Sequence, residues 1–109
     1  MDIDNLPHAV ALYLRYENDD GADGVEQCFA PDAQVRDEGE TMRGWEAIKA
    51  WKRSAKARYR YRVEPLSARR TADALIVRVR TTGNFPGSPV ELDHVIGLDG
   101  ERIAMLEIR

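Results

Sequence analysis

The stretch VELDHVIGLDGERIAMLEI, residues 90–108, decides the fold of this chain. Two apolar runs flank the dipeptide Asp99-Gly100, and Asp-Gly between apolar runs is a strong signal for a tight β-hairpin. Further back, residues 75–82 and 59–66 form two more β-prone runs, and turn-forming residues separate the runs. The C-terminal half is therefore predicted to hold four consecutive strands in an antiparallel meander.

The N-terminal half has helical spacing instead. Behind a candidate N-cap at Asn5, apolar side chains recur every three or four residues and predict a helix that ends near residues 18–21. A short second helix is predicted to end at Pro31, and residues 33–37 alternate like a strand. The stripe of the first helix is Leu6, Val10, Tyr13, Leu14 and Glu17, and the second helix turns Val25, Cys28 and Phe29 inward.

A third helix is predicted at residues 45–57, after a connection at residues 41–44. The order helix, helix, strand, helix, four strands is typical of an α+β fold. We expect one domain, residues 1–109, in which a curved antiparallel sheet wraps over three N-terminal helices as a cone around a ligand-sized cavity. The third helix is predicted to turn Ile48, Trp51 and Ala55 toward the core and Lys49, Lys52, Arg53 and Lys56 mostly toward water.

Charge and composition exclude several classes of function. The 109 residues carry 16 basic and 19 acidic side chains, a net charge of −3, which is a poor basis for binding nucleic acid. The basic run between Lys49 and Arg62 is read as solvated charge. Two histidines, one cysteine and scattered carboxylates show no metal-ligand spacing, so we expect neither metal nor cofactor.

The single Cys28 cannot form an internal disulfide, and we expect a small buried thiol in a reducing compartment. The acidic start of the chain lacks the apolar segment of a secretory signal, and no apolar run approaches the ~20 residues of a membrane helix. We therefore expect a cytoplasmic protein without a membrane partner.

Several motifs carry a resemblance to a known family. The run Phe29-Ala30-Pro31-Asp32-Ala33 before the first strand, with Arg43-Gly44 opening the third helix, resembles the NTF2-like superfamily. Asp37-Glu38-Gly39, the helix start 44–51 and the loop 84–87 resemble its SnoaL-like bacterial members. The resemblance covers the whole chain. It implies the fold well and the reaction poorly, because the superfamily includes isomerases, polyketide cyclases and non-catalytic proteins.

Ketosteroid isomerases of this superfamily use a helix Tyr, a first-strand Asp and a late-strand Asp before a His. The corresponding positions here are Tyr13, Asp37 and Asp93, with His94 following. The resemblance implies that Asp37 is a general base, while Tyr13 and Asp93 donate hydrogen bonds to the dienolate oxygen.

The residue pattern leaves alternatives open for two of these positions. Asp37 shares the parity of the apolar Ala33 and Val35, so it either lines the cavity as a base with a raised pKa or caps the following turn. Tyr13 lies on the apolar stripe, where its hydroxyl either enters the pocket or bonds a backbone carbonyl.

Strand alternation conflicts with the resemblance at the late strand. It places His94 on the same face as Leu92 and Ile96, and Asp93 on the other face, whereas the resemblance requires Asp93 inside. An inward His94 would form an acid/base couple with Asp37 or pack in an interface. Arg78 and Arg80 are predicted to face outward. The expected walls of the cavity are Trp51, Tyr59, Tyr61 and Phe85.

Three functions fit this pattern: a proton-transfer enzyme acting on a small apolar carbonyl compound, a non-catalytic module that binds an apolar small molecule, or a dimeric interaction module. Apolar residues of both strand parities, such as Val79 beside Ile76 and Val95 beside Ile96, exceed what one core needs. This excess predicts a homodimer through the outer face of the sheet.

Overall fold

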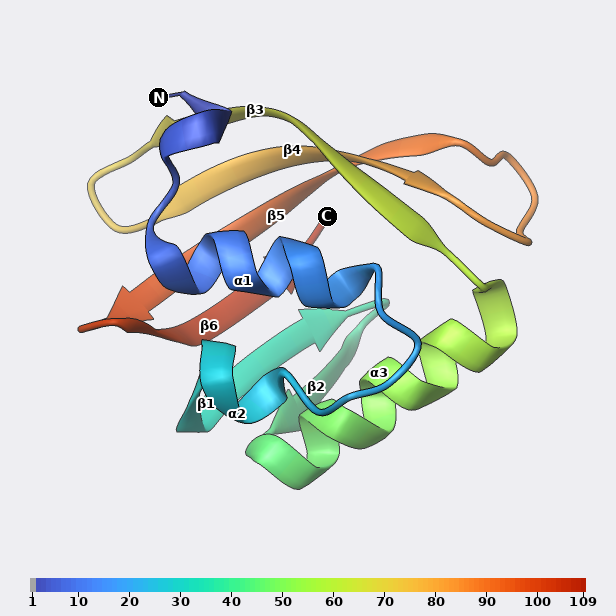
Figure 1. Cartoon of the computed structure of the whole chain (residues 1–109), viewed down its shortest axis with the longest axis horizontal. Helices are drawn as coiled ribbons and strands as arrows, with labels where there is room; N and C mark the ends of the chain where they lie inside the picture. Colours follow the sequence, from blue (N-terminus) through green and yellow to red (C-terminus); the bar gives the residue numbers. More distant parts are fainter. Residues whose placement is uncertain (1) are drawn as a thin grey trace.

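A curved, six-stranded sheet forms the body of the computed structural model, which describes residues 2–109 (Figure 1). The spatial order of the strands is β2-β1-β6-β5-β4-β3. Their bounds are β1 (Phe29–Asp37), β2 (Glu40–Arg43), β3 (Arg62–Arg70), β4 (Leu75–Thr82), β5 (Val90–Asp99) and β6 (Arg102–Ile108). Strands β3 to β6 form the predicted meander, with antiparallel pairing throughout.

The sheet is mixed rather than purely antiparallel, which corrects the expectation from the sequence. Strand β1 pairs with β6 in parallel. The meander ends on β6, whose free edge is the place where β1 pairs, and the long connection through α3 allows a parallel register. Pro31 lies within β1, where the ladder to β6 is interrupted between Phe29 and Gln34. A proline has no N–H for the ladder, so its place at this irregularity is expected.

The segment predicted to be a connection before the third helix forms strand β2 instead. Asp37 pairs with Glu40 across a two-residue loop. The loop residues Glu38 and Gly39 have φ angles of 52° and 79°, the positive φ pair of a tight hairpin turn. Gly44 follows with φ 84° and is the N-cap of α3.

The helices are a 3₁₀ turn η1 (Ile3–Asn5), α1 (His8–Glu17), α2 (Val25–Cys28) and α3 (Trp45–Tyr59). Asn5 does not cap α1, contrary to prediction. The residue before a proline is confined to extended backbone, so Leu6 is extended and the helix begins only after Pro7. Asp2 caps the 3₁₀ turn instead.

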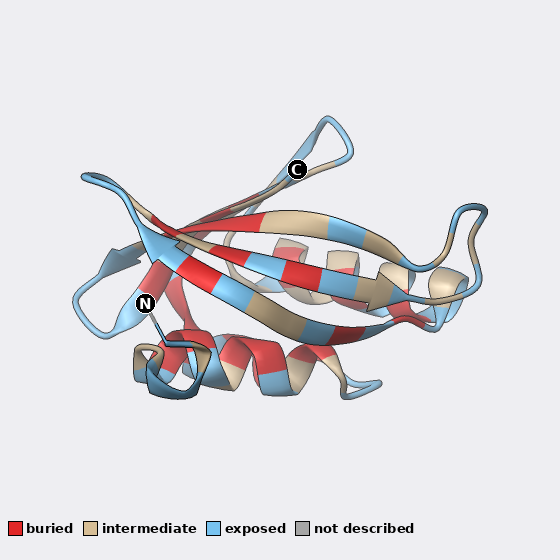
Figure 2. Ribbon diagram, turned by 90° about the horizontal axis from the view of Figure 1, so that it is seen from above, coloured by how far each residue is buried: buried red, intermediate tan, exposed pale blue. Residues whose placement is uncertain are grey.

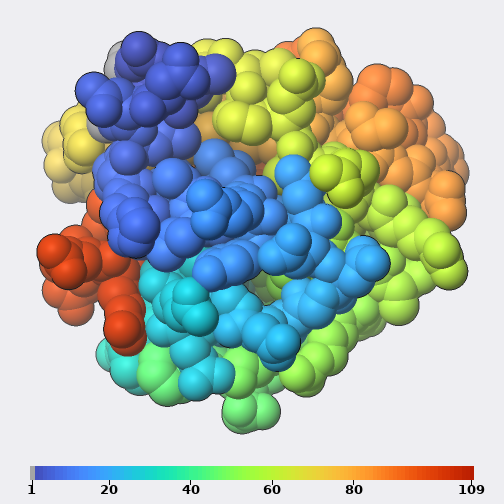
Figure 3. Space-filling model, viewed as in Figure 1, coloured from blue at the N-terminus to red at the C-terminus, as the bar shows by residue number. Residues whose placement is uncertain are grey.

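The core lies between the concave face of the sheet and the helices. Buried and exposed residues alternate along the strands (Figure 2), as expected when one face packs on a core. In the space-filling view, the blue and cyan residues of α1 and α2 lie in front at the centre, and the green residues of α3 lie below them (Figure 3). Each helix within residues 2–109 is too short or too polar to span a membrane.

Two lysines of α3 are buried, contrary to prediction. Lys52 is 4% exposed and Lys56 is 6% exposed. The ammonium of Lys52 donates hydrogen bonds to the carbonyl oxygens of Tyr16 and Gly21, and that of Lys56 donates to the carbonyl of Tyr61. Because these carbonyls satisfy the ammonium groups, the lysine stems can pack inside the protein.

Candidate active site

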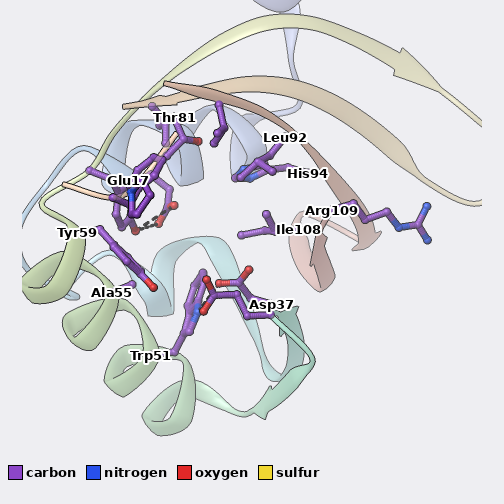
Figure 4. A pocket seen from close by; sticks show the side chains of 16 residues that line it. Glu17, Asp37, Trp51, Ala55, Tyr59, Thr81, Leu92, His94, Ile108 and Arg109 are labelled. Carbon is purple, nitrogen blue, oxygen red and sulfur yellow. Dashed lines mark hydrogen bonds between the residues drawn. The ribbon is translucent and has the colours of Figure 1, made fainter. Parts of the chain in front are cut away.

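A cavity of about 510 Å³ opens between the sheet and α3 (Figure 4). This volume is in the usual range for small-molecule sites. The end of α1, the β1–β2 hairpin, α3, β5, the C-terminal end of β6 and the loop after β4 all contribute to its wall. The lining residues are Glu17, Asp37, Glu38, Trp51, Ala55, Tyr59, Tyr61, Val63, Thr81, Phe85, Pro86, Val90, Leu92, His94, Ile108 and Arg109.

Asp37, the last residue of β1, is one of the lining residues. The indole Nε1 of Trp51 donates a hydrogen bond to Asp37 Oδ2 at 3.1 Å. Burial raises the pKa of Asp37, and the hydrogen bond from Trp51 only partly opposes this effect. A carboxylate whose pKa is raised toward neutrality accepts protons more readily, as a general base requires.

His94 faces the cavity, and Asp93 lies on the other face of β5. His94 is 2% exposed, whereas the carboxylate of Asp93 accepts a hydrogen bond from Arg78 at 3.1 Å on the outer surface. The register between β4 and β5 is regular here, so simple alternation holds. The resemblance placed Asp93 in the site, and the structure corrects this. The outward orientation expected for Arg78 and Arg80 is observed.

Tyr13 does not line this cavity, which corrects its expected place as a direct donor to a ligand. Its hydroxyl contacts the Nδ1 atom of His94 at 2.7 Å. Burial raises the pKa of Tyr13 well above its usual value, so the phenol keeps its proton. A neutral phenol can donate to Nδ1 or accept from it; in the arrangement in which Tyr13 donates, the neutral ring of His94 carries its hydrogen on Nε2, at the other edge of the ring.

Burial also keeps the imidazole of His94 neutral. It lowers the pKa of His94 to about 4, and Asp93 across the strand opposes this only in part. At neutral pH His94 therefore presents an uncharged ring to the cavity, and its Nε2–H can donate a hydrogen bond to a ligand.

Glu17 was missed as a site residue from the sequence. It ends α1, is 4% exposed and lines the cavity. The Tyr61 hydroxyl donates to its carboxylate at distances of 3.1 and 3.2 Å to the two oxygens. Burial raises the pKa of Glu17 to about 7. The signal that could have found it was its place on the apolar stripe of the first helix, where a carboxyl group is out of pattern.

Aromatic side chains form much of the wall. Trp51, Tyr59, Tyr61 and Phe85, the four aromatic residues expected there, all line the cavity. The Tyr59 and Phe85 rings meet edge to face, with centroids 5.9 Å apart. Within residues 2–109, no three His, Cys, Asp or Glu side chains are grouped so that they could hold a metal ion.

A mixed sheet curved over three helices, with a cavity between them, is the NTF2-like architecture. The family model of the SnoaL-like domain matches residues 10–105. The chain belongs to this SnoaL-like family.

Solved structures agree with this assignment. A candidate polyketide cyclase from Sinorhizobium meliloti is 38% identical, with 100% of each chain covered and a TM-score of 0.93. A protein with a ketosteroid isomerase-like fold from Catenulispora acidiphila, in complex with trimethylamine, is 22% identical, with 96% of this chain and 86% of its own covered and a TM-score of 0.83. A candidate isomerase of the SnoaL-like family from Agrobacterium tumefaciens is 19% identical, with 92% of each chain covered and a TM-score of 0.76. None of the curated proteins compared with the chain matches it.

Proposed function

We propose that this protein is a proton-transfer enzyme, isomerase-like or polyketide-cyclase-like, that acts on a small and largely apolar carbonyl compound. The observation that carries the proposal is that Asp37 and the neutral His94 line one cavity with aromatic and aliphatic walls. A base and a hydrogen-bond donor in one apolar site are what the removal of a proton beside a carbonyl group requires.

In this mechanism Asp37 accepts a proton from the carbon next to the carbonyl group. The electron pair of that C–H bond forms the enolate, whose oxygen takes up negative charge. His94 donates its Nε2–H to that oxygen, and an uncharged donor suffices for this role. In this proposal Tyr13 acts through His94: its hydroxyl donates to Nδ1, which leaves the hydrogen of the neutral ring on Nε2.

The comparisons support this reaction class without defining the substrate. The Sinorhizobium relative, a candidate polyketide cyclase, matches over the full length of the chain. The Agrobacterium structure is described as a candidate isomerase of the same family. The isomerisation of an enone can begin with removal of the proton next to its carbonyl group, and this is the step that we propose for Asp37 and His94.

The test is turnover of simple β,γ-unsaturated ketones, followed by absorbance of the conjugated product. Asp37→Asn is expected to lose most of the activity while the protein stays folded, because the amide keeps the shape but accepts no proton. His94→Gln is expected to lower kcat by roughly 10²–10³-fold, the usual effect of one lost oxyanion donor. The matched control is Asp93→Asn, on the outer face, which should keep wild-type activity. No turnover of any enone by the wild-type protein would contradict the proposal.

A second candidate is a binding module without catalysis. The aromatic walls favour it, and the related Catenulispora structure holds trimethylamine. Aromatic faces beside carboxylates attract alkylammonium ions. Calorimetry can measure the binding of choline and of its uncharged analogue 3,3-dimethylbutan-1-ol. The comparison distinguishes a site that binds cations from one that binds apolar molecules. Preference for choline that disappears in Asp37→Asn would support ammonium binding, and equal or weaker binding of choline would refute it.

A further inference from the structure

We propose that Glu17 is a second proton-transfer residue of this cavity, which gives the substrate a proton while Asp37 removes one. The inference rests on the proposed function and defines the reaction further, because each carboxyl group then handles a different proton. A single carboxyl group that removes a proton and returns the same one is the alternative.

The position of Glu17 carries the proposal. Its carboxyl group lies at the cavity wall on a different element from Asp37, since Glu17 ends α1 and Asp37 ends β1. In Figure 4 the Glu17 side chain enters the cavity from the side of Tyr59, and Asp37 enters from the side of the β1–β2 hairpin. A ligand that fills the cavity would contact both groups.

The surroundings of Glu17 favour a carboxyl group that holds its proton. Among residues 2–109 no lysine, arginine or histidine forms a salt bridge with it. The two nearby ammonium groups, of Lys52 and Lys56, bond backbone carbonyls instead. Burial without an ion pair disfavours the charged form. Glu17 and several nearby ionisable groups influence one another's pKa. These groups are Tyr13, Cys28, Asp37, Lys52, Lys56 and Tyr61.

The proposed steps balance for a β,γ-unsaturated ketone. Asp37 takes the proton from the α-carbon, and the electrons of that bond form a dienolate whose oxygen is held by His94. Glu17 gives its proton to the γ-carbon, where a new C–H bond forms as the C=O bond is restored. Asp37 then releases its proton to water and Glu17 takes one up from water. The reaction needs no oxidant and no other reactant.

The closing experiment follows hydrogen isotopes in heavy water. If Glu17 delivers the proton, its exchangeable deuterium appears at the γ-carbon, and NMR of the product should show about one solvent deuterium there per turnover. If Asp37 returns the proton that it took, the product keeps the hydrogen of the substrate. Retention of the substrate hydrogen by an active wild-type enzyme overturns the inference and leaves the proposed function intact. Absence of turnover overturns both.

Variants separate a catalytic role from a structural one. Glu17→Gln keeps the shape and still accepts a hydrogen bond from Tyr61, and its kcat should fall on the order of 10²-fold or more. In the wild type, activity should fall above pH 7, where Glu17 loses its proton. Tyr61→Phe removes the donor that stabilises the carboxylate, so this alkaline limb should move to higher pH. Glu91→Gln, on the outer face of the sheet, is the matched control. An unchanged alkaline limb in Tyr61→Phe together with full activity in Glu17→Gln would overturn the inference.

Discussion

Replacing Glu17 with glutamine is expected to change the free energy of unfolding relative to the wild type, and this difference should be more favourable to the variant at pH 8 than at pH 4.5. The pKa of Glu17 is raised from 4.5 to about 7 in the folded protein, and each pKa unit corresponds to about 1.4 kcal/mol. The folded state therefore binds the proton more tightly than the unfolded state does. This contribution to stability is present below pH 4.5 and is lost as the pH rises through about 7. The loss amounts to about 3 kcal/mol at pH 8, and glutamine cannot lose a proton there.

His94 produces the opposite trend in nearly the same pH window. Its pKa is lowered from 6.5 to about 4, so the unfolded state binds the proton more tightly. Its contribution to stability is present above pH 6.5 and is lost as the pH falls through about 4. In the wild type the two trends offset each other between roughly pH 4.5 and 6.5, as their similar and opposite shifts require. In Glu17→Gln the Glu17 contribution that offsets the His94 trend is gone, so stability should rise more steeply with pH in this range than it does in the wild type.

Urea unfolding of both proteins, from pH 4.5 to pH 8, measures the difference directly. The free energy of unfolding of Glu17→Gln minus that of the wild type should increase by about 3 kcal/mol over this range. Glu91→Gln serves as the control, because its side chain lies on the outer face beside Arg78. A difference between Glu17→Gln and the wild type that stays constant from pH 4.5 to pH 8 would refute the reasoning, since Glu17 would then not be held protonated by burial.

Two other predictions concern packing and assembly. A Cβ atom at Gly83 would lie 2.7 Å from a backbone carbonyl oxygen, whereas at Gly21 it would meet nothing within 4 Å. Gly83→Ala should therefore lower the free energy of unfolding by roughly 1–3 kcal/mol, whereas Gly21→Ala should leave it nearly unchanged. Equal free energies of unfolding for the two variants in urea would contradict this prediction. We also propose the homodimer through the outer face, where Val95 is buried outside the core cluster and pairs with Ile76. Sedimentation should then give a mass twice the 12.3 kDa of the chain, and the Ile76→Asp variant should sediment as a monomer. A wild-type protein that is monomeric at micromolar concentration would contradict the proposed dimer.

Much of the fold could be predicted from the sequence because local patterns determine it. The strand 75–82 was predicted with the bounds that β4 has, and Gly100 has the positive φ expected of the hairpin turn. Strand β2 was missed because it is four residues long and mostly exposed, so no apolar alternation marks it. The parallel pairing of β1 with β6 was missed because it joins segments about 70 residues apart in the chain, and no local pattern records such a contact.

The site was predicted less completely than the fold, and the reasons are physical. Strand parity gave the correct faces for Asp37 and His94. The resemblance misplaced Asp93, because matching residue types does not fix which face of a strand they occupy. Glu17 was placed on the apolar stripe of the first helix without a role, and Lys52 was expected mostly toward water, although burial decides the chemistry of both. Burial depends on distant elements that a sequence pattern does not show.

The charge states of the cavity fit the proposed chemistry. Near neutral pH His94 is uncharged and Glu17 holds its proton for a large part of the time, and Asp37, the proposed base, lines the same cavity. When Asp37 accepts a proton, one negative charge leaves its carboxylate and another forms on the substrate oxygen. The number of buried charges does not change, so this step avoids most of the cost of placing a new charge in an apolar site. A tyrosine hydroxyl contacts each of the two groups: Tyr13 bonds the neutral ring of His94, and Tyr61 donates to Glu17 and partly offsets the rise of its pKa. Loss of either tyrosine should therefore change how activity depends on pH more than it changes the affinity for an uncharged ligand.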